Sequence, residues 1–186
     1  MKKQIKVTLI VIVAAIIAAA IIWYVMYLRG KEQDLLTPVG TRAEFIGDTD
    51  KYPTMLTAKG TQILNADGEQ VVLKGVMVPE SRSLYEEKKF NEDFYKDVFA
   101  KGGNAIRVPI SPVEYKNDDY YMWRYLDRIV TWAGENDNYV ILDWDYTGNP
   151  IDGSGDEMPD LDENPLDYSA EFWKNIADYF KNTPNV

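Results

Sequence analysis

The chain of 186 residues contains neither cysteine nor histidine. The lack of cysteine excludes a disulfide framework and a catalytic thiol. The lack of histidine excludes histidine-based zinc sites and histidine-dependent catalytic triads. A P-loop for phosphate binding is missing as well. The remaining polar chemistry rests on carboxylates, arginine, tyrosine and tryptophan, and we predict neither a cofactor nor a bound metal.

Basic residues are scarce beyond the N-terminus. Five of the 20 lysines and arginines lie in residues 1–31, which contain no acidic residue, so residues 32–186 carry 15 basic and 30 acidic side chains, a net charge of −15. Such an acidic surface repels phosphate backbones, and we therefore predict no nucleic-acid partner. A neutral ligand such as a sugar is compatible with this charge.

The longest apolar run covers residues 7–28 and contains no charged side chain. At about 1.5 Å per residue it matches a hydrocarbon core of about 30 Å. Aromatic residues at its end, followed by Arg29 and Lys31, are typical of a membrane interface. A cleavable signal peptide is the alternative, although its apolar region is normally about 7–15 residues long and ends at a small-residue cleavage site. We predict a signal-anchor at residues 1–30 with a transmembrane helix at about 7–28.

Positive charge on the two sides of this helix predicts its orientation. Lys2, Lys3, Lys6 and the terminal amine outnumber Arg29 and Lys31, so we expect a cytoplasmic N-terminus and an extracytoplasmic globular part. Residues 31–57 have little periodicity and are predicted to form a juxtamembrane linker, with the folded domain at 58–186.

Short apolar strands alternate with amphipathic helices in this domain. Residues 60–76 predict two strands around the Asp67-Gly68 turn, the second starting at Val71. Further strands are predicted at 105–110, ending at Pro109, and at 139–144. Helices are predicted at 91–101, 121–135 and 169–181. Ser169 is expected to cap the last of these, with Phe172, Trp173, Ile176 and Phe180 facing inward.

The predicted strand starts at Val71, Ala105 and Tyr139 are each 34 residues apart, with one helix between successive strands. This order indicates right-handed βαβ units and a parallel sheet. A fourth strand would begin at Asn185. Three units leave both sheet edges open, so we expect either a chain that continues or a partial barrel.

Asp143 and Asp145 stand where the strand at 139–144 meets a loop, the usual position of chemistry in parallel α/β folds. The alternative is that they merely cap the following turn. The acid-rich loop at 152–167 resembles a calcium loop in part, but Pro165 occupies the position where the sharp turn of that loop requires glycine.

Four segments carry a resemblance to a known family. They are GTQILNADGEQVVLKGV at 60–76, GGNAIRVPI at 102–110, YLDRIVTWAGENDNYVILDWDYTGN at 125–149 and FWKNIADYFKNTPNV at 172–186. Together they resemble glycoside hydrolase family 5, the cellulase-like enzymes that act on β-linked polysaccharides. The resemblance implies an α/β fold consisting of the first three βα units of a (β/α)8 TIM barrel, with an N-terminal β-hairpin.

The resemblance also implies roles for single residues. Arg107 matches an arginine of the second barrel strand that helps to keep the nucleophile ionised. Asp145 stands where the family has a histidine, and an ionised aspartate can only accept hydrogen bonds. The departure implies that Asp145 is protonated in place, that it serves a changed substrate, or that the site is weakened. Tyr115 and Tyr146 follow the second and third strands and are expected either to stack on sugar rings or to pack. We predict Arg107, Asp145, Tyr146 and Tyr115 as substrate-binding residues.

No catalytic residue is predicted in the chain. A retaining mechanism needs two carboxyl groups about 5–5.5 Å apart, and the resemblance implies that the acid/base follows strand 4 and that the nucleophile follows strand 7. We therefore expect a membrane-tethered glycoside hydrolase, similar to an endoglucanase, that is truncated before its catalytic glutamates and inactive as these 186 residues alone. The alternatives are a non-catalytic partial barrel that binds carbohydrate, and a membrane protein that uses this domain for assembly.

Overall fold

The computed structural model describes residues 2–34, 51–152, 154, 161 and 164–186. The chain divides into two compact units, Met1–Thr37 and Pro38–Val186. Most of the predicted linker at 31–57 and much of the acid-rich loop at 152–167, including the calcium-like positions 160 and 162, lie outside the described residues.

The first unit contains one helix, α1 (Lys2–Asp34). Its apolar part, Ile12–Arg29, has a mean hydropathy of 2.1 and exposed side chains. Trp23 and Tyr27 stack one turn apart, with ring centroids separated by 5.7 Å. The helix is long and apolar enough to cross a membrane, a property that N-terminal signal sequences share.

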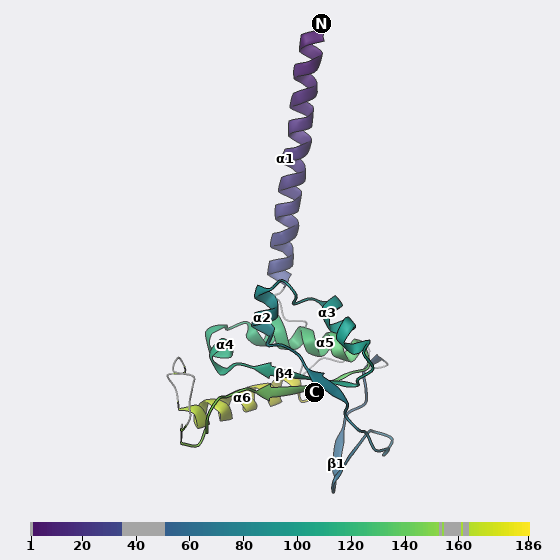
Figure 1. Cartoon of the computed structure of the whole chain (residues 1–186), viewed down its shortest axis with the longest axis vertical. Helices are drawn as coiled ribbons and strands as arrows, with labels where there is room; N and C mark the ends of the chain where they lie inside the picture. Colours follow the sequence, from purple (N-terminus) through teal and green to yellow (C-terminus); the bar gives the residue numbers. More distant parts are fainter. Residues whose placement is uncertain (1, 35–50, 153, 155–160, 162–163) are drawn as a thin grey trace. The chain divides into compact units, whose positions relative to one another are not determined.

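The second unit opens with an antiparallel strand pair and continues with alternating strands and helices (Figure 1). Its elements are β1 (Thr57–Lys59), β2 (Gln62–Leu64), β3 (Gly75–Met77), α2 (Ser81–Glu86), α3 (Glu92–Phe99), β4 (Ala105–Ile110), α4 (Pro112–Asn117), the π-helix η2 (Met122–Leu126), α5 (Asp127–Glu135), β5 (Tyr139–Trp144) and α6 (Pro165–Phe180).

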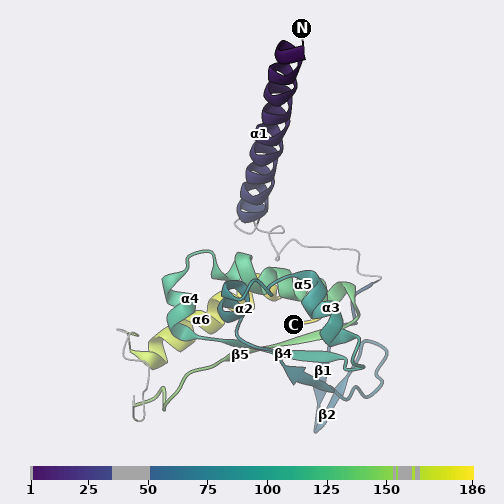
Figure 2. The same ribbon diagram turned by 45° about the horizontal axis from the view of Figure 1, so that its top comes forward.

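Strands β3, β4 and β5 form a parallel sheet in that order, as the alternation of strands and helices predicts. Ala105 pairs with Gly75 on one side and with Tyr139 on the other. Figure 2 shows that helices α2 to α6 gather on one face of this sheet. The opposite face is left open among the described residues, and it carries the exposed side chains of Met77, Arg107 and Ile141.

The hydrophobic core lies between the sheet and the helices. Because side chains alternate along a strand, the even-numbered residues of β4 and β5 point into this layer. Its members include Ile106, Val108 and Ile110 of β4, Val140 of β5, Ile129 and Val130 of α5, and Phe172, Ile176 and Phe180 of α6, none of which is more than 4% exposed.

The first parallel strand starts later than the sequence predicts. It begins at Gly75, and residues 71–74 are not part of the ladder. The reason is Asn104, whose Oδ1 accepts from Lys74 N at 2.7 Å and whose Nδ2 donates to Val72 O at 3.1 Å. This side chain replaces the strand partner that the preceding residues would otherwise need.

The antiparallel part contains the predicted turn and one more. β1 and β2 turn at Gly60, which has a φ of 62°, and the chain then turns again at Asp67-Gly68, across which Val71 N donates to Ile63 O. That turn lies between Leu64 and Gln70, which form an isolated bridge. It is held by Asn65 Oδ1, which accepts from the backbone N–H groups of Asp67 and Glu69 at 3.1 and 2.8 Å.

Strand β4 continues through Pro109 to Ile110, one residue beyond its predicted end. Arg107 O accepts from Val78 N, and Ile110 O accepts from Asp145 N. The backbone N–H and C=O groups of odd-numbered β4 residues therefore point toward β3, and those of even-numbered residues point toward β5. Pro109 is odd-numbered and lies beyond the end of β3, so its missing N–H costs the β4–β5 ladder no hydrogen bond.

Two helices begin differently from the sequence-based expectation. The helix predicted at 121–135 opens with the π-helix η2, and only the rest is α-helical. Helix α6 begins at Pro165 and is capped by Asn164, whose side chain accepts from the N–H groups of Leu166 and Asp167, so Ser169 is not the cap. Pro165 suits this start because its fixed φ matches the first helical position.

The predicted inward face of α6 is confirmed except at one residue. Phe172, Ile176 and Phe180 are buried as predicted, but Trp173 is 42% exposed. Beyond α6, Asn185 is fully buried, and its backbone O accepts from Val140 N of β5 at 2.7 Å. The start of the predicted fourth strand therefore lies beside β5.

Candidate functional site

Polar side chains gather where the three parallel strands end. β3 leads into Glu80, β4 into Ser111, and β5 into Asp145 and Tyr146. Ligands bind at the carboxyl edge of parallel sheets because the connecting loops converge there. This edge, together with the open face of the sheet that leads to it, is the candidate site.

An ion pair lies on the open face. Arg107 Nη2 of β4 is 2.7 Å from Asp143 Oδ2 of β5, and the two side chains are 50% and 22% exposed. Arg107 Nη1 also lies 3.6 Å from the sulfur of Met77 on β3. Arg107 therefore links all three strands, and its remaining N–H donors are accessible to a ligand.

The partner of Arg107 was not predicted. Sequence reasoning left Asp143 without a role, although the signal was available. A spacing of 34 residues places Ile141 opposite Arg107, as observed, and the next residue on the same face of β5 is Asp143. Two opposite charges at diagonal positions of neighbouring strands are within reach of each other when one of them is arginine.

Asp145 and Tyr146 lie just beyond β5. Asp145 N donates to Ile110 O at 3.0 Å, which continues the strand register for one residue and leaves the exposed Asp145 at the rim of the open face. Tyr146 N donates to Trp144 O at 3.0 Å, and the residue is half-buried. Arg107, by contrast, pairs with Ile141 in the middle of β4, four residues before the level of Asp145.

Tyr115 is not on this face. Ser111 caps α4 by accepting from Glu114 N, and the resulting helix carries Tyr115 into the layer between the sheet and α6. Its ring contacts Tyr121, Trp144 and Phe172 at centroid distances of 5.8, 6.3 and 5.0 Å. Burial raises the pKa of the Tyr115 hydroxyl. The structure does not bring Tyr115 together with Arg107 and Asp145.

Glu80 is a second carboxylate at the ends of the strands that sequence reasoning missed. Its Oε2 accepts from Ser83 N at 2.9 Å and caps α2, and its Oε1 accepts from the Tyr121 hydroxyl at 2.6 Å. Burial, followed by the charge of Glu80, raises the pKa of Tyr121, which is only 1% exposed. Both oxygens of Glu80 have structural partners, so we assign it a supporting role.

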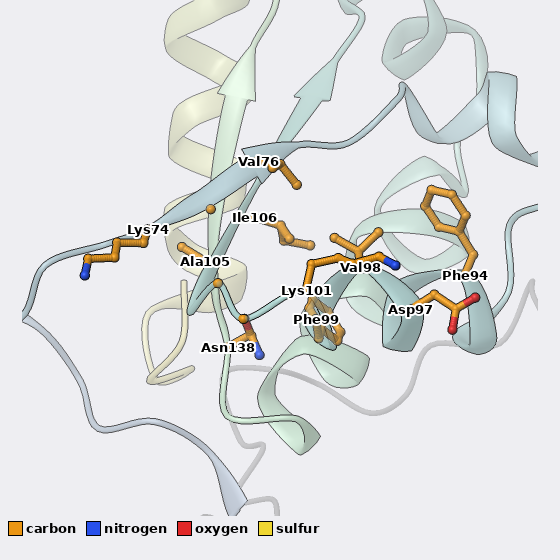
Figure 3. Close-up of a pocket in the computed structure, with 13 residues that line it drawn as sticks. Lys74, Val76, Phe94, Asp97, Val98, Phe99, Lys101, Ala105, Ile106 and Asn138 are labelled. Carbon is orange, nitrogen blue, oxygen red and sulfur yellow. The ribbon is translucent and has the colours of Figure 1, made fainter.

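A hollow of about 610 Å³ lies beside β3 on the helix side of the sheet. Figure 3 shows Val76, Ile106, Val98 and Phe94 facing one another across it, whereas Lys74 points away. The walls carry little polar chemistry, and the hollow is not at the carboxyl edge. Within the described part of the chain, no cluster of three or more carboxylates is arranged to hold a metal ion.

Comparisons with known proteins agree with this geometry. A model of the cellulase family (glycosyl hydrolase family 5) matches residues 64–186. Endoglucanase A of Butyrivibrio fibrisolvens is 27% identical over 152 residues, which are 73% of this chain and 31% of that protein. The crystal structure of a β-glucanase from Saccharophagus degradans in complex with cellotetraose is 25% identical with a TM-score of 0.67, and the match covers 75% of this chain and 42% of that one.

The native form of that β-glucanase matches with the same values. The chain therefore spans about a third of the length of the endoglucanase and less than half of the β-glucanase. The family match nevertheless covers well over half of the chain, and its parallel α/β fold resembles those barrels. The chain belongs to the cellulase family, glycosyl hydrolase family 5.

Proposed function

We propose that this chain provides part of the substrate-binding wall of a glycoside hydrolase that acts on a β-linked polysaccharide of the glucan type. The observation that carries the proposal is the Arg107–Asp143 pair on the open sheet face, with Asp145 at the rim where the strands end. The related β-glucanase binds cellotetraose, a β-linked glucan fragment, and this supports the same class of ligand here.

Each of these residues has a defined chemical task in the proposal. Arg107 donates hydrogen bonds to sugar hydroxyl oxygens, and the ion pair with Asp143 fixes the direction of its guanidinium group. Asp145 accepts hydrogen bonds from sugar hydroxyls, because an ionised carboxylate has no proton to donate. Tyr115, which lies in the helix layer, does not join this group.

Bond cleavage requires a carboxylic acid and a carboxylate on either side of the glycosidic bond. Asp143 forms an ion pair with Arg107, and in the proposal its task is to orient that guanidinium group. In the proposal the cleaving pair belongs to barrel strands other than β3, β4 and β5, and residues 58–186 contribute the first three βα units. The Arg107–Asp143 pair on the open sheet face also favours a second candidate function, a non-catalytic protein that binds polysaccharide.

The proposal includes a membrane tether. Helix α1 acts as an uncleaved anchor at residues 1–30, residues 31–57 act as a linker, and the barrel part lies outside the cytoplasm. Protease treatment of intact cells distinguishes these arrangements. An outward-facing domain is digested while an epitope placed before Lys2 is protected, whereas a cleaved signal sequence leaves no such epitope on the mature protein.

The function is tested with the full chain in a detergent that has no sugar headgroup. Depletion of the protein from solution by insoluble β-1,4-glucan is compared with depletion by β-mannan and by an α-linked glucan, and released reducing ends are measured in the same tubes. The proposal predicts depletion by the β-1,4-glucan, none by the α-linked glucan, and no hydrolysis by these 186 residues. The absence of depletion by the β-1,4-glucan would refute it.

A further inference from the structure

A second hollow is lined by residues of helices α4, η2 and α6 and of the loop before η2. It has a volume of about 410 Å³, within the range of about 300–1,000 Å³ typical of small-molecule sites. We call it the outer hollow. None of its lining residues belongs to a strand. They include Tyr115 of α4, Asp119 in the loop before η2, Met122 and Trp123 of η2, and Tyr168 and Glu171 of α6.

The lining of the outer hollow combines aromatic rings with short charged groups. Trp123 is partly exposed, the more enclosed Tyr115 and Tyr168 also line the wall, and Asp119 and Glu171 are exposed acceptors. Rings that offer an apolar face beside hydrogen-bonding groups suit a pyranose, whose C–H faces are apolar and whose equator carries hydroxyls.

The π-helix explains why Trp123 lies in the wall of the hollow. A π-turn inserts an extra residue into a helix, shifts the direction of the side chains and is frequently found at functional sites. Met122 and Trp123 are the first two residues of η2, and both line the outer hollow. The Tyr120 ring lies 5.8 Å from Trp123 and extends the aromatic surface outward, because Tyr120 is 42% exposed.

The rim that precedes η2 is held in place by Asp118. Its Oδ2 is 2.7 Å from Arg124 Nη1, and its Oδ1 accepts from Tyr120 N at 2.9 Å. The Asp118 side chain is only 8% exposed, so this pair is shielded from water. A wall fixed in this way loses little conformational entropy when a ligand binds.

The charges of the outer hollow select against other ligands. Asp118 is paired with Arg124, and the remaining acidic residues, Asp119 and Glu171, outnumber Lys116, so a phosphate or another anion is disfavoured. The described carboxylates form no cluster of three suited to a metal ion. Aromatic surface together with hydrogen-bonding groups, and without a dominant cationic site, matches a neutral polyhydroxylated ligand.

We propose that the outer hollow is a second glycan-binding site, which takes one or two sugar units of a β-linked polysaccharide at a distance from the Arg107 face. The inference rests on the proposed function for the class of ligand, but the two sites share no residue. A surface site of this kind holds the polymer near the membrane and raises its effective concentration at the first site.

The test uses Trp123→Ala, with Trp173→Ala as the matched control, because Trp173 is a half-exposed tryptophan outside the hollow. The full chain is held in a detergent without a sugar headgroup, and its retention on insoluble β-1,4-glucan is measured. We expect Trp123→Ala to weaken retention by roughly three- to tenfold, the range that loss of one stacked ring gives. Trp173→Ala should leave retention unchanged.

Two further measurements separate lost binding from lost folding. Glu171→Ala changes an exposed side chain, and it should also weaken retention while leaving the circular dichroism spectrum and melting temperature intact. Fluorine NMR of the chain labelled with 5-fluorotryptophan should show the Trp123 signal, assigned with Trp123→Phe, moving when cellotetraose is added.

The results distinguish this inference from the proposed function. If the wild type binds β-1,4-glucan, but Trp123→Ala and Glu171→Ala bind equally well and the Trp123 signal does not move, the outer hollow is not a glycan site and the first site stands. If the wild-type chain binds no β-linked glycan at all, both proposals are overturned.

Discussion

Arg107 and Asp143 face each other diagonally across the parallel strands β4 and β5, with 2.7 Å between Nη2 and Oδ2. The pair lies on the face of the sheet that the helices leave open. An exposed arginine in an apolar strand contributes little to packing. In the proposed function, a ligand approaches this face beside Met77 and Ile141.

Removal of this arginine should barely change stability. Arg107 is half exposed, and exposed ion pairs contribute about 0–1 kcal/mol, so Arg107→Met should lower the free energy of unfolding by no more than about 1 kcal/mol. Urea unfolding followed by circular dichroism measures this, with Arg82→Met as the control at another exposed pair, Arg82–Glu86. A much larger loss at Arg107 would mean that the pair serves the fold.

The start of helix α6 is tested by substitutions at Asn164 and Ser169. Asn164→Ala removes the side chain that accepts from Leu166 N and Asp167 N, and loss of such a cap costs about 1 kcal/mol. Ser169→Ala should have almost no effect, because Ser169 lies inside the helix. Equal losses, or a larger loss at Ser169, would place the helix start where the sequence alone suggested it.

The buried face of α6 is tested by two adjacent aromatic residues. Phe172 is fully buried against Trp144, with ring centroids 4.2 Å apart, and Phe172→Ala should cost about 3–5 kcal/mol. Trp173→Ala should cost far less, because Trp173 is 42% exposed. Urea unfolding of both variants provides the comparison, and a reversed order would contradict the packing of this helix on the sheet.

The Tyr121–Glu80 contact predicts sensitivity to alkaline pH. Burial and Glu80 raise the pKa of Tyr121 above its ordinary value of 10.0, so the folded protein keeps this proton where the unfolded chain loses it. The resulting stability is fully present below pH 10.0 and decreases as pH rises above it, by up to about 1.4 kcal/mol per pH unit.

Tyr121→Phe should therefore make the decline of unfolding free energy above about pH 10 less steep. Near pH 8 it should cost about 1.5–3 kcal/mol, because it removes a hydrogen bond to a charged group. Tyr120→Phe, at an exposed ring, is the control. An unchanged slope in Tyr121→Phe would show that another group causes the alkaline loss.

The sequence allowed the parallel sheet and its register to be predicted from strand spacing and helical periodicity. The 34-residue spacing holds between β4 and β5, because both strands are continuous apolar runs. It fails between β3 and β4, where Gly75 pairs with Ala105, 30 residues away. The difference comes from the side chain of Asn104, which binds the backbone of residues 72 and 74, and such a long-range contact has no periodic signal.

The candidate site was predictable only in part. The alternation of side chains along a strand places Arg107 on the face of the sheet away from the core. The position of Asp145 directly after a strand marks it as a candidate site residue. For Tyr115 the sequence left sugar stacking and packing open, because the six residues of α4 are too few to show the helical pattern that turns this ring into the helix layer. The outer hollow combines residues of α4, η2 and α6, which only the tertiary fold brings together.

The most direct test of the account is the affinity of the full chain for cellotetraose, measured by isothermal titration calorimetry for the wild type, Arg107→Met and Arg82→Met. We predict measurable binding by the wild type and by Arg82→Met. For Arg107→Met we predict a loss of about tenfold or more, since hydrogen bonds from a charged donor contribute about 1.5–3 kcal/mol. Binding that is unaffected by Arg107→Met, or no binding by the wild type, would contradict the assignment of this sheet face as the substrate site.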